Sequence, residues 1–263
     1  MTMDLEEYLR RDYISGLIEK GMRLDEREFD QYREIKIVNG FIKEKAEGSS
    51  YVELGDTKVI AGVKMGIGDP FSDRPEEGVL MTNAEIRPIG SPKFELGPPG
   101  EVGVELARVV DRGIRESKII DTSNLLIGDG KVWMVFVDIH VLDHCGNLID
   151  ASGIAAMSAL LDAKIPKYED GAVLNGEHTG DLPVSDIVVP VTVAKVGKHL
   201  ICDPSIDEEY ALDARLTVAT TDRINAMQKG GTGTLTRDEI MDIVDLSFLK
   251  GGAIRQQIKD SKI

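Results

Sequence analysis

Residues 132–163 read VWMVFVDIHVLDHCGNLIDASGIAAMSALLDA, and they place a long strand pattern directly before a helical one. Val132–Leu142 is rich in β-branched and aromatic residues, which favours a buried strand that includes Trp133. HCGN at 144–147 predicts a turn. Asp150–Ala163 alternates small and apolar residues in a helical rhythm and ends before Pro166, which disfavours helix at its preceding residue. A strand, a turn and a helix therefore form the centre of the chain.

The segments on either side of this centre predict an α+β protein. Residues 4–20 form an amphipathic helical pattern that stops at Gly21, and residues 102–117 form another after the Pro/Gly-rich connection 88–100. Thr236 is the expected cap of a closing helix. Strand patterns, interpreted in the first half as a run of antiparallel strands, cover residues 34–38, 48–54, 58–63, 79–86, 187–194, 199–202, 212–219 and 223–228.

A segment rich in Gly, Asp, Glu and Pro divides the chain into two units. We expect residues 166–186 to be a connecting loop. An N-terminal helix and lead-in (1–30) then precedes a first unit (31–165), and a shorter second unit (187–263) follows the loop. Strands followed by a helix recur in both units without a letter-by-letter repeat.

The composition limits the class of protein. A length of 263 residues with 42% hydrophobic content supports a real core. We expect a cytoplasmic protein, because no apolar run of about 18 residues occurs and the charged start does not resemble a signal peptide. Cys145 and Cys202 predict neither a disulfide framework nor a zinc site, and we expect no metal and no cofactor. The net charge of −15 argues against a protein that coats nucleic acid without a local basic patch.

Five carboxylates lie between two strand patterns of the second unit. They are Asp203, Asp207, Glu208, Glu209 and Asp213. Clustered acids next to strands hold divalent metals or act in acid/base chemistry. The alternative is a solvated turn in which Pro204 interrupts the strand. Composition alone leaves both interpretations open.

Three arginines follow one face of the predicted helix at 102–117. Arg108, Arg112 and Arg115 are spaced i, i+4 and i+7. Guanidinium groups in line suit a phosphodiester backbone, because each can form paired bonds to phosphate oxygens. Acids such as Glu105 and Asp111 stand at ion-pair spacing on the same helix, so the local sequence favours a salt-bridged, solvated face.

Two other motifs have ordinary interpretations. GGTGTL at 230–235 follows Lys229 but lacks the Gly-Lys-Ser/Thr of a Walker loop, so we expect a tight turn between a strand and a helix. His140 and His144 are four residues apart in a strand and a turn, where that spacing does not align them as metal ligands.

Four motifs occur in the order of a known family. They are RLDER at 23–27, ELARVVDRGIRES at 105–117, VWMVFVDIHVLDHCGNLIDAS at 132–152, and LPVSDIVVPVTVAKVGKHLICDPSIDEEYALDAR at 182–215. On these motifs the chain resembles the RNase PH family, and within it the non-catalytic subunit of the archaeal exosome core ring, although Glu26 stands where the family commonly has Gly. The resemblance implies an RNase PH-like fold, with a ribosomal protein S5 domain 2-like βαβα core and a second, smaller α+β unit.

The resemblance also implies a loss of chemistry. Catalytic relatives hold inorganic phosphate, the nucleophile, on a loop with an arginine, and the matching position here is Ser152-Gly153-Ile154. Isoleucine offers no donor to a phosphate anion. Glu209 and Asp213 are four residues apart, whereas the aspartates of the relatives are six apart. We therefore expect no catalytic residue, and we interpret the carboxylates as a degenerate acidic site made of Asp203, Asp207, Glu209 and Asp213.

The implied role is structural and RNA-positioning. The subunit would pair with a catalytic RNase PH-like subunit as a trimer of heterodimers, under cap subunits with RNA-binding domains and away from any membrane. Arg112 and Arg115, and with them Arg108, would contact single-stranded RNA. One alternative is a 3′-to-5′ exoribonuclease that is active by itself, with phosphate or with Mg²⁺ on the acidic cluster. A small-molecule kinase that uses GGTGTL is the third hypothesis.

Overall fold

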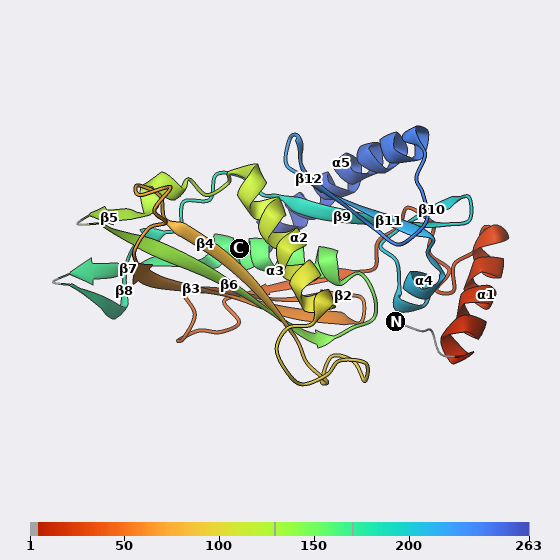
Figure 1. The fold of residues 1–263 in the computed structure, drawn as a ribbon, viewed down its shortest axis with the longest axis horizontal. Coiled ribbons are helices and arrows are strands. Elements are labelled where there is room, and N and C mark those ends of the chain that lie inside the picture. Colours follow the sequence, from red (N-terminus) through yellow and green to blue (C-terminus); the bar gives the residue numbers. More distant parts are fainter. Residues whose placement is uncertain (1–4, 129, 170, 263) are drawn as a thin grey trace.

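The largest of three sheets among the described residues has six strands and carries the first half of the chain (Figure 1). The computed structural model describes residues 5–128, 130–169 and 171–262. The strand order is β1-β2-β3-β6-β4, with β5 also paired to β6. The strands are β1 (Ile35–Asn39), β2 (Gly48–Leu54), β3 (Thr57–Gly68), β4 (Val79–Ile86), β5 (Leu126–Gly128) and β6 (Lys131–Asp143).

The prediction of consecutive antiparallel strands is wrong for β4. Strands β1, β2, β3 and β6 pair antiparallel, but β4 pairs parallel with β6, in a register that sets Val79 opposite Met134. Between β4 and β6 the chain crosses over through α2 (Glu101–Ser117) and the 3-10 helix η1 (Thr122–Leu125). A helical crossover is the connection that parallel neighbours require.

A second sheet has four antiparallel strands in the order β10-β9-β11-β12. Helix α5 (Arg237–Asp260) packs on β9 and β11. The predicted cap at Thr236 is confirmed, because its hydroxyl accepts from Glu239 N while Thr236 N donates to the Glu239 carboxylate. GGTGTL forms the expected turn before α5, with Gly231 at a φ of 78°. The strands are β9 (Val189–Val196), β10 (His199–Cys202), β11 (Ala214–Thr220) and β12 (Ile224–Gly230).

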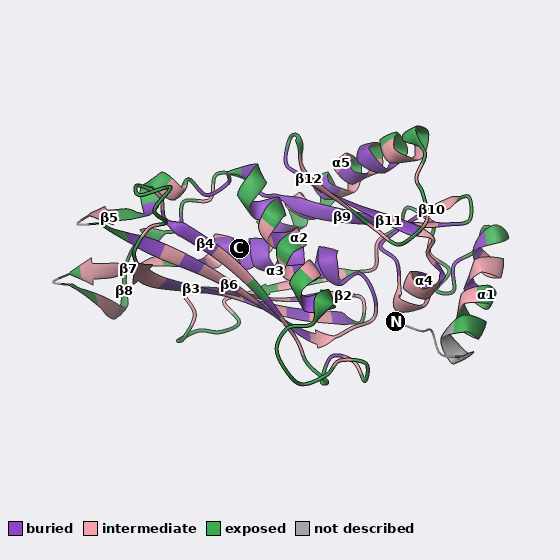
Figure 2. Ribbon diagram, in the orientation of Figure 1, coloured by how far each residue is buried: buried purple, intermediate pink, exposed green. Residues whose placement is uncertain are grey.

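Two helices lie between the sheets. Helix α3 (Leu148–Asp162) contacts β2 and β3 on one side and β9 on the other, while α2 contacts β4, β11 and β12. Figure 2 shows α3 buried along most of its length, as an almost wholly apolar helix must be. Trp133 is 6% exposed, which confirms its place in the core. The core therefore runs from one sheet to the other through α3.

The segment 166–186 is not an open loop, so this prediction is wrong. It contains most of an antiparallel hairpin formed by β7 (Lys164–Glu169) and β8 (Ala172–Asp181), which extends beyond the first sheet in Figure 1. Pro166 lies inside β7, and the pairing register shifts there, as expected for a residue that cannot donate to a strand ladder.

The N-terminal helix is confirmed as α1 (Leu5–Glu19). Its Ile14 and Ile18 are buried, and the helix packs on α4 (Ile206–Ala211) of the second half. Helix α4 was not predicted from the sequence, in which its residues were interpreted as part of a turn. In the part of the chain that the structure describes, no helix has the length and apolar character needed to span a membrane.

Candidate functional site

The predicted acidic cluster is divided among separate partners. Short helix α4 begins with a capping box, in which Ser205 Oγ accepts from Glu208 N and Ser205 N donates to Glu208. Asp203 is fully buried, and its carboxylate accepts from Arg27 at 3.0 Å and from Arg33 at 2.7 Å. Its oxygens are therefore occupied by this chain's own cations.

Arg23 makes the most enclosed ion pair of the RLDER segment. Its Nε and Nη2 bind the two Glu208 oxygens at 2.8 and 2.7 Å, and its side chain is 0% exposed. Arg23 also donates to the Cys202 carbonyl at 3.0 Å. Glu26 has a φ of 62°, the left-handed region that favours the glycine common in the family. The term RLDER clamp denotes Arg23, Arg27, Arg33, Asp203 and Glu208, which fasten the lead-in segment to the second half.

The remaining acids differ in their surroundings. Asp207 pairs with Arg10 at 3.0 Å near the surface, and the Asp213 carboxylate accepts from Gly197 N at 2.8 Å. Glu209 instead lines a cavity of about 430 Å³ beside the start of α3. Among the described residues, no three His, Cys, Asp or Glu side chains converge where they could hold a metal ion. Asp203 and Glu209 both accept from Asn147, whereas Asp207 and Asp213 bind other partners, so the four residues expected to form one degenerate acidic site do not form a single cluster.

Two titratable side chains in the cavity beside α3, Glu209 and His144, have shifted pKa values. Glu209 accepts from Asn147 N at 2.8 Å, and burial raises the pKa of Glu209 to about 6. His144 stacks on Phe94, with ring centroids 5.5 Å apart. Burial, together with the charges of Arg33 and Lys93, lowers the pKa of His144 to about 4, so this histidine is neutral at pH 7.

The position matched to the phosphate loop is part of the core. Ser152, Gly153 and Ile154 lie within α3 and are buried, and Ile154 is 0% exposed. A Cβ on Gly153 would come within 2.3 Å of Pro190 Cγ, so α3 and β9 are in close contact there. No cationic side chain stands at this position.

Asp150 is the buried carboxylate in the first turn of α3. It is 0% exposed, and it accepts from the Tyr32 hydroxyl at 2.6 Å, from Asn147 Nδ2 at 2.8 Å and from Thr192 Oγ1 at 2.7 Å. Burial raises the pKa of Asp150 to about 6, and these hydrogen bonds oppose the rise. Asn147 Nδ2 also donates to Asp203, which links Asp150 to the RLDER clamp.

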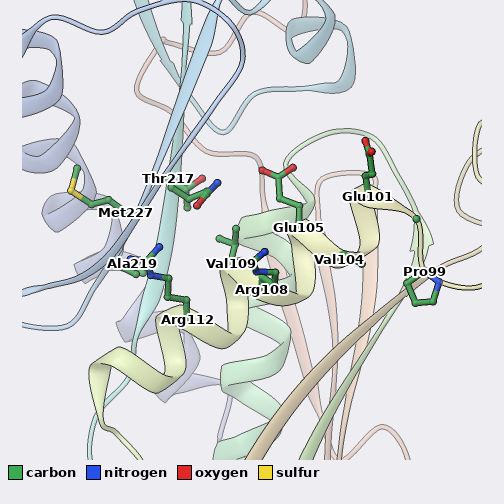
Figure 3. Close-up of a pocket in the computed structure, with 13 residues that line it drawn as sticks. Pro99, Glu101, Val104, Glu105, Arg108, Val109, Arg112, Thr217, Ala219 and Met227 are labelled. Atoms are coloured by element: carbon green, nitrogen blue, oxygen red, sulfur yellow. The ribbon is translucent and has the colours of Figure 1, made fainter. Parts of the chain in front are cut away.

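The arginines of α2 separate into two settings. Arg108 and Arg112 line a groove of about 530 Å³ between α2 and strands β11 and β12, shown in Figure 3. Among the described residues, neither has an ion-pair partner. Arg115 instead pairs with Asp111 at 2.9 Å, donates to the Leu80 carbonyl, and lines a different cavity.

The intrahelical ion pairs expected on α2 form in part. The Asp111–Arg115 pair is confirmed, whereas Glu105 binds Arg215 of β11 at 2.8 Å. Sequence reasoning also missed the opposite wall of the groove, where Thr217 and Ala219 of β11 and Gln228 of β12 face α2. No local signal marks them, because they reach the helix through tertiary packing.

The whole chain is similar to known proteins. The 3′ exoribonuclease family, domain 1, matches residues 31–166, and domain 2 matches residues 186–248. Exosome complex component Rrp42 of Thermococcus gammatolerans is 48% identical over 255 residues, which cover 94% of this chain and 93% of that protein. The same component of Methanocella arvoryzae is 47% identical over 262 residues, which cover 98% and 99%. The Archaeoglobus fulgidus exosome with RNA bound to the active site has a chain that matches with a TM-score of 0.89 at 44% identity, over 97% of this chain and 99% of that one.

Proposed function

The chain belongs to the 3′ exoribonuclease family, and we propose that, as an exosome subunit, it is non-catalytic and positions RNA for a catalytic partner. In this proposal it pairs with a catalytic RNase PH-like subunit, and three pairs form a hexameric ring for 3′-to-5′ phosphorolysis. Cap subunits with RNA-binding domains sit on the ring, and the complex is cytoplasmic. Relatives named as exosome components, and a similar chain from an RNA-bound exosome, support the proposal.

The burial of Ile154 is the observation that carries the non-catalytic role. A phosphate nucleophile must approach an RNA phosphodiester, and donors and cations have to offset the repulsion between the two anions. Ile154 is 0% exposed and apolar, and Gly153 beside it is in close contact with Pro190. Asp203, the most enclosed of the acids, is neutralised by Arg27 and Arg33. Phosphate therefore lacks a binding group at the matching position.

The groove on α2 supports the RNA-positioning role. Arg108 and Arg112 stand on successive helical turns, roughly 6 Å apart along the axis. Arginine binds phosphate oxygens through paired hydrogen bonds, which orient the backbone without reading its sequence. A local basic strip of this kind lets a chain with a net charge of −15 bind RNA inside a channel that other subunits complete.

Phosphate-dependent degradation of labelled single-stranded RNA tests this proposal. The purified chain alone should degrade no RNA, and addition of the catalytic subunit should give a higher rate than that subunit gives alone. Glu209→Gln in the reconstituted complex should leave the rate unchanged. Phosphorolysis by the isolated chain, or loss of activity in Glu209→Gln with assembly intact, would instead favour the alternative of an enzyme active by itself.

A further inference from the structure

The carboxylate of Glu105 on α2 has two candidate arginine partners. Arg108 stands three residues later on the same helix, a spacing that brings opposite charges together. Arg215 belongs to β11, 110 positions along the chain. In the structure Glu105 accepts from Arg215 Nη2 at 2.8 Å, and Figure 3 shows its carboxylate directed away from Arg108. The tertiary contact therefore forms in place of the intrahelical pair.

The second sheet directs Arg215 toward α2. Side chains alternate along a strand, so Arg215 projects from the same face of β11 as Thr217 and Ala219, which line the groove beside α2. Across the ladder Arg215 pairs with Gly230, the first residue of the GGTGTL motif. A Cβ on Gly230 would come within 2.6 Å of Arg215 Nε. The absence of a side chain at Gly230 therefore leaves the space through which Arg215 reaches Glu105.

This ion pair changes the charge that the groove presents to a ligand. Glu105 lines the groove together with Arg108 and Arg112, and it stands about one helical turn before Arg108. An unpaired carboxylate there would bind Arg108 or repel a phosphate anion. Arg215 neutralises it from outside, because Arg215 lines the neighbouring cavity beside α3 and not the groove itself.

We propose that Arg215 is a positioning residue for RNA binding, which holds the Glu105 carboxylate away from Arg108 and so keeps Arg108 available to the RNA backbone. The inference rests on the proposed function in taking RNA as the ligand of the α2 arginines. It adds a residue of β11 that acts through Glu105 and does not itself contact RNA. The GGTGTL motif thereby gains a role, since its first glycine gives Arg215 the space to reach α2.

Anisotropy titrations of labelled single-stranded RNA with the reconstituted complex, at several salt concentrations, test the proposal. Arg215→Met removes the charge but keeps a long side chain, so the affinity should fall roughly two- to fivefold and the salt slope should become shallower by up to about one unit. Arg215→Lys keeps the charge and should stay within about twofold of the wild type. Combining Arg215→Met with Glu105→Gln should restore both the affinity and the salt dependence, because no carboxylate is left to bind Arg108.

Two matched variants identify the route of the effect. The charge of Arg215 also acts on Glu209, so the combination of Arg215→Met with Glu209→Gln should bind RNA as weakly as Arg215→Met alone. Lys250→Met removes a cation of similar exposure, 22% against 23%, which pairs with Asp30 at 2.8 Å and lines a different cavity. This variant should leave the RNA affinity at the wild-type value.

The outcomes separate this inference from the proposed function. If Arg112→Ala weakens RNA binding but Arg215→Met does not, the positioning role of Arg215 is overturned and the RNA contact stands. If Arg215→Met weakens binding and Glu105→Gln does not restore it, Arg215 acts by a route other than Glu105, which also overturns the inference. If neither Arg112→Ala nor Arg215→Met has an effect, the RNA contact of the proposed function fails together with the inference.

Discussion

The arginines of the RLDER clamp and those of the α2 groove place the same side chain in opposite settings. Arg23, Arg27 and Arg33 have side chains 0–11% exposed, and each binds a carboxylate. Arg108 and Arg112 are exposed, and the described residues provide neither with an acid. Asp203 lies 170 positions along the chain from Arg33, and Glu208 lies 185 positions from Arg23. The fold therefore decides which arginines hold the structure together and which are available to a ligand.

Removing a clamp arginine should have the largest effect. Arg23→Ala leaves the Glu208 carboxylate buried and unpaired, which costs about 3–5 kcal/mol in the free energy of unfolding. Urea unfolding at pH 7 measures this loss. Arg74→Ala removes an exposed pair with Glu77 and, as the control, should cost less than about 0.5 kcal/mol.

A double variant tests whether the charge itself matters at this site. Arg23→Met with Glu208→Met removes both buried ions, and it should recover much of the stability lost in Arg23→Ala, because apolar pairs often replace buried ion pairs without loss. If Arg23→Ala costs no more than Arg74→Ala, the two groups of arginines do not differ energetically and the comparison fails.

The second prediction uses a buried carboxylate that has no arginine. Asp150 touches the clamp through Asn147, but its hydrogen-bond partners are neutral, and its pKa is raised from 3.8 to about 6. A buried, protonated Asp150 is favoured by the fold, so its stabilisation is fully present at a pH below the pKa of the unfolded chain, 3.8. This stabilisation is lost as the pH rises through about 6, the pKa in the folded chain. The wild type should therefore lose roughly 2–3 kcal/mol relative to Asp150→Asn between pH 4 and pH 7.

Unfolding curves at several pH values check this result. The contributions of His144 and Glu209 titrate in both proteins, so the difference between the two curves isolates Asp150. A difference that does not change with pH would mean that neutral donors keep a buried carboxylate ionised as well as the clamp arginines do.

The sequence predicted local elements better than long-range partners. Alternating apolar residues located β2, β4 and β10 with their observed bounds, and Thr236 was found from capping chemistry. The parallel pairing of β4 was missed because pairing is a tertiary property, and the 164–181 hairpin because its composition is that of a loop. Ser205 and Glu208 have the spacing of a capping box, which predicts the start of a helix at α4. This helix was missed because Glu208 was interpreted as part of an acidic cluster.

The candidate site was predictable in part, for the same reason. The position of Ile154 follows from a motif, whereas the pairing of Asp203 and Glu208 with arginines of the lead-in depends on the folded chain. Likewise, helical spacing placed Arg108, Arg112 and Arg115 on one face. Contacts with Asp111 and Leu80, from the helix itself and from β4, set Arg115 apart.

The third prediction removes an arginine of the groove. Arg112→Ala should leave the free energy of unfolding within about 0.5 kcal/mol of the wild type, because no described carboxylate loses a partner. RNA binding by the reconstituted complex should weaken by roughly 1–3 kcal/mol, and the salt dependence should fall by about one unit of slope. Anisotropy titrations at several salt concentrations measure both. If Arg112→Ala leaves the RNA affinity unchanged but lowers the free energy of unfolding, Arg112 stabilises the fold as the clamp arginines do and does not bind RNA.

The smallest effect should come from Arg115, which stands between the two classes. It is exposed like Arg112, but it binds Asp111 one turn away and the Leu80 carbonyl. Exposed i,i+4 pairs contribute about 0.3–0.5 kcal/mol, so Arg115→Ala should lower the free energy of unfolding by roughly that amount and leave RNA affinity unchanged. Arg115→Lys, which keeps the charge but not the forked donor, is the matched control for affinity. If Arg115→Ala weakens RNA binding as much as Arg112→Ala, an arginine that is paired with a carboxylate on its own helix still binds RNA phosphate. The helical spacing of the arginines would then be enough to identify the RNA contacts.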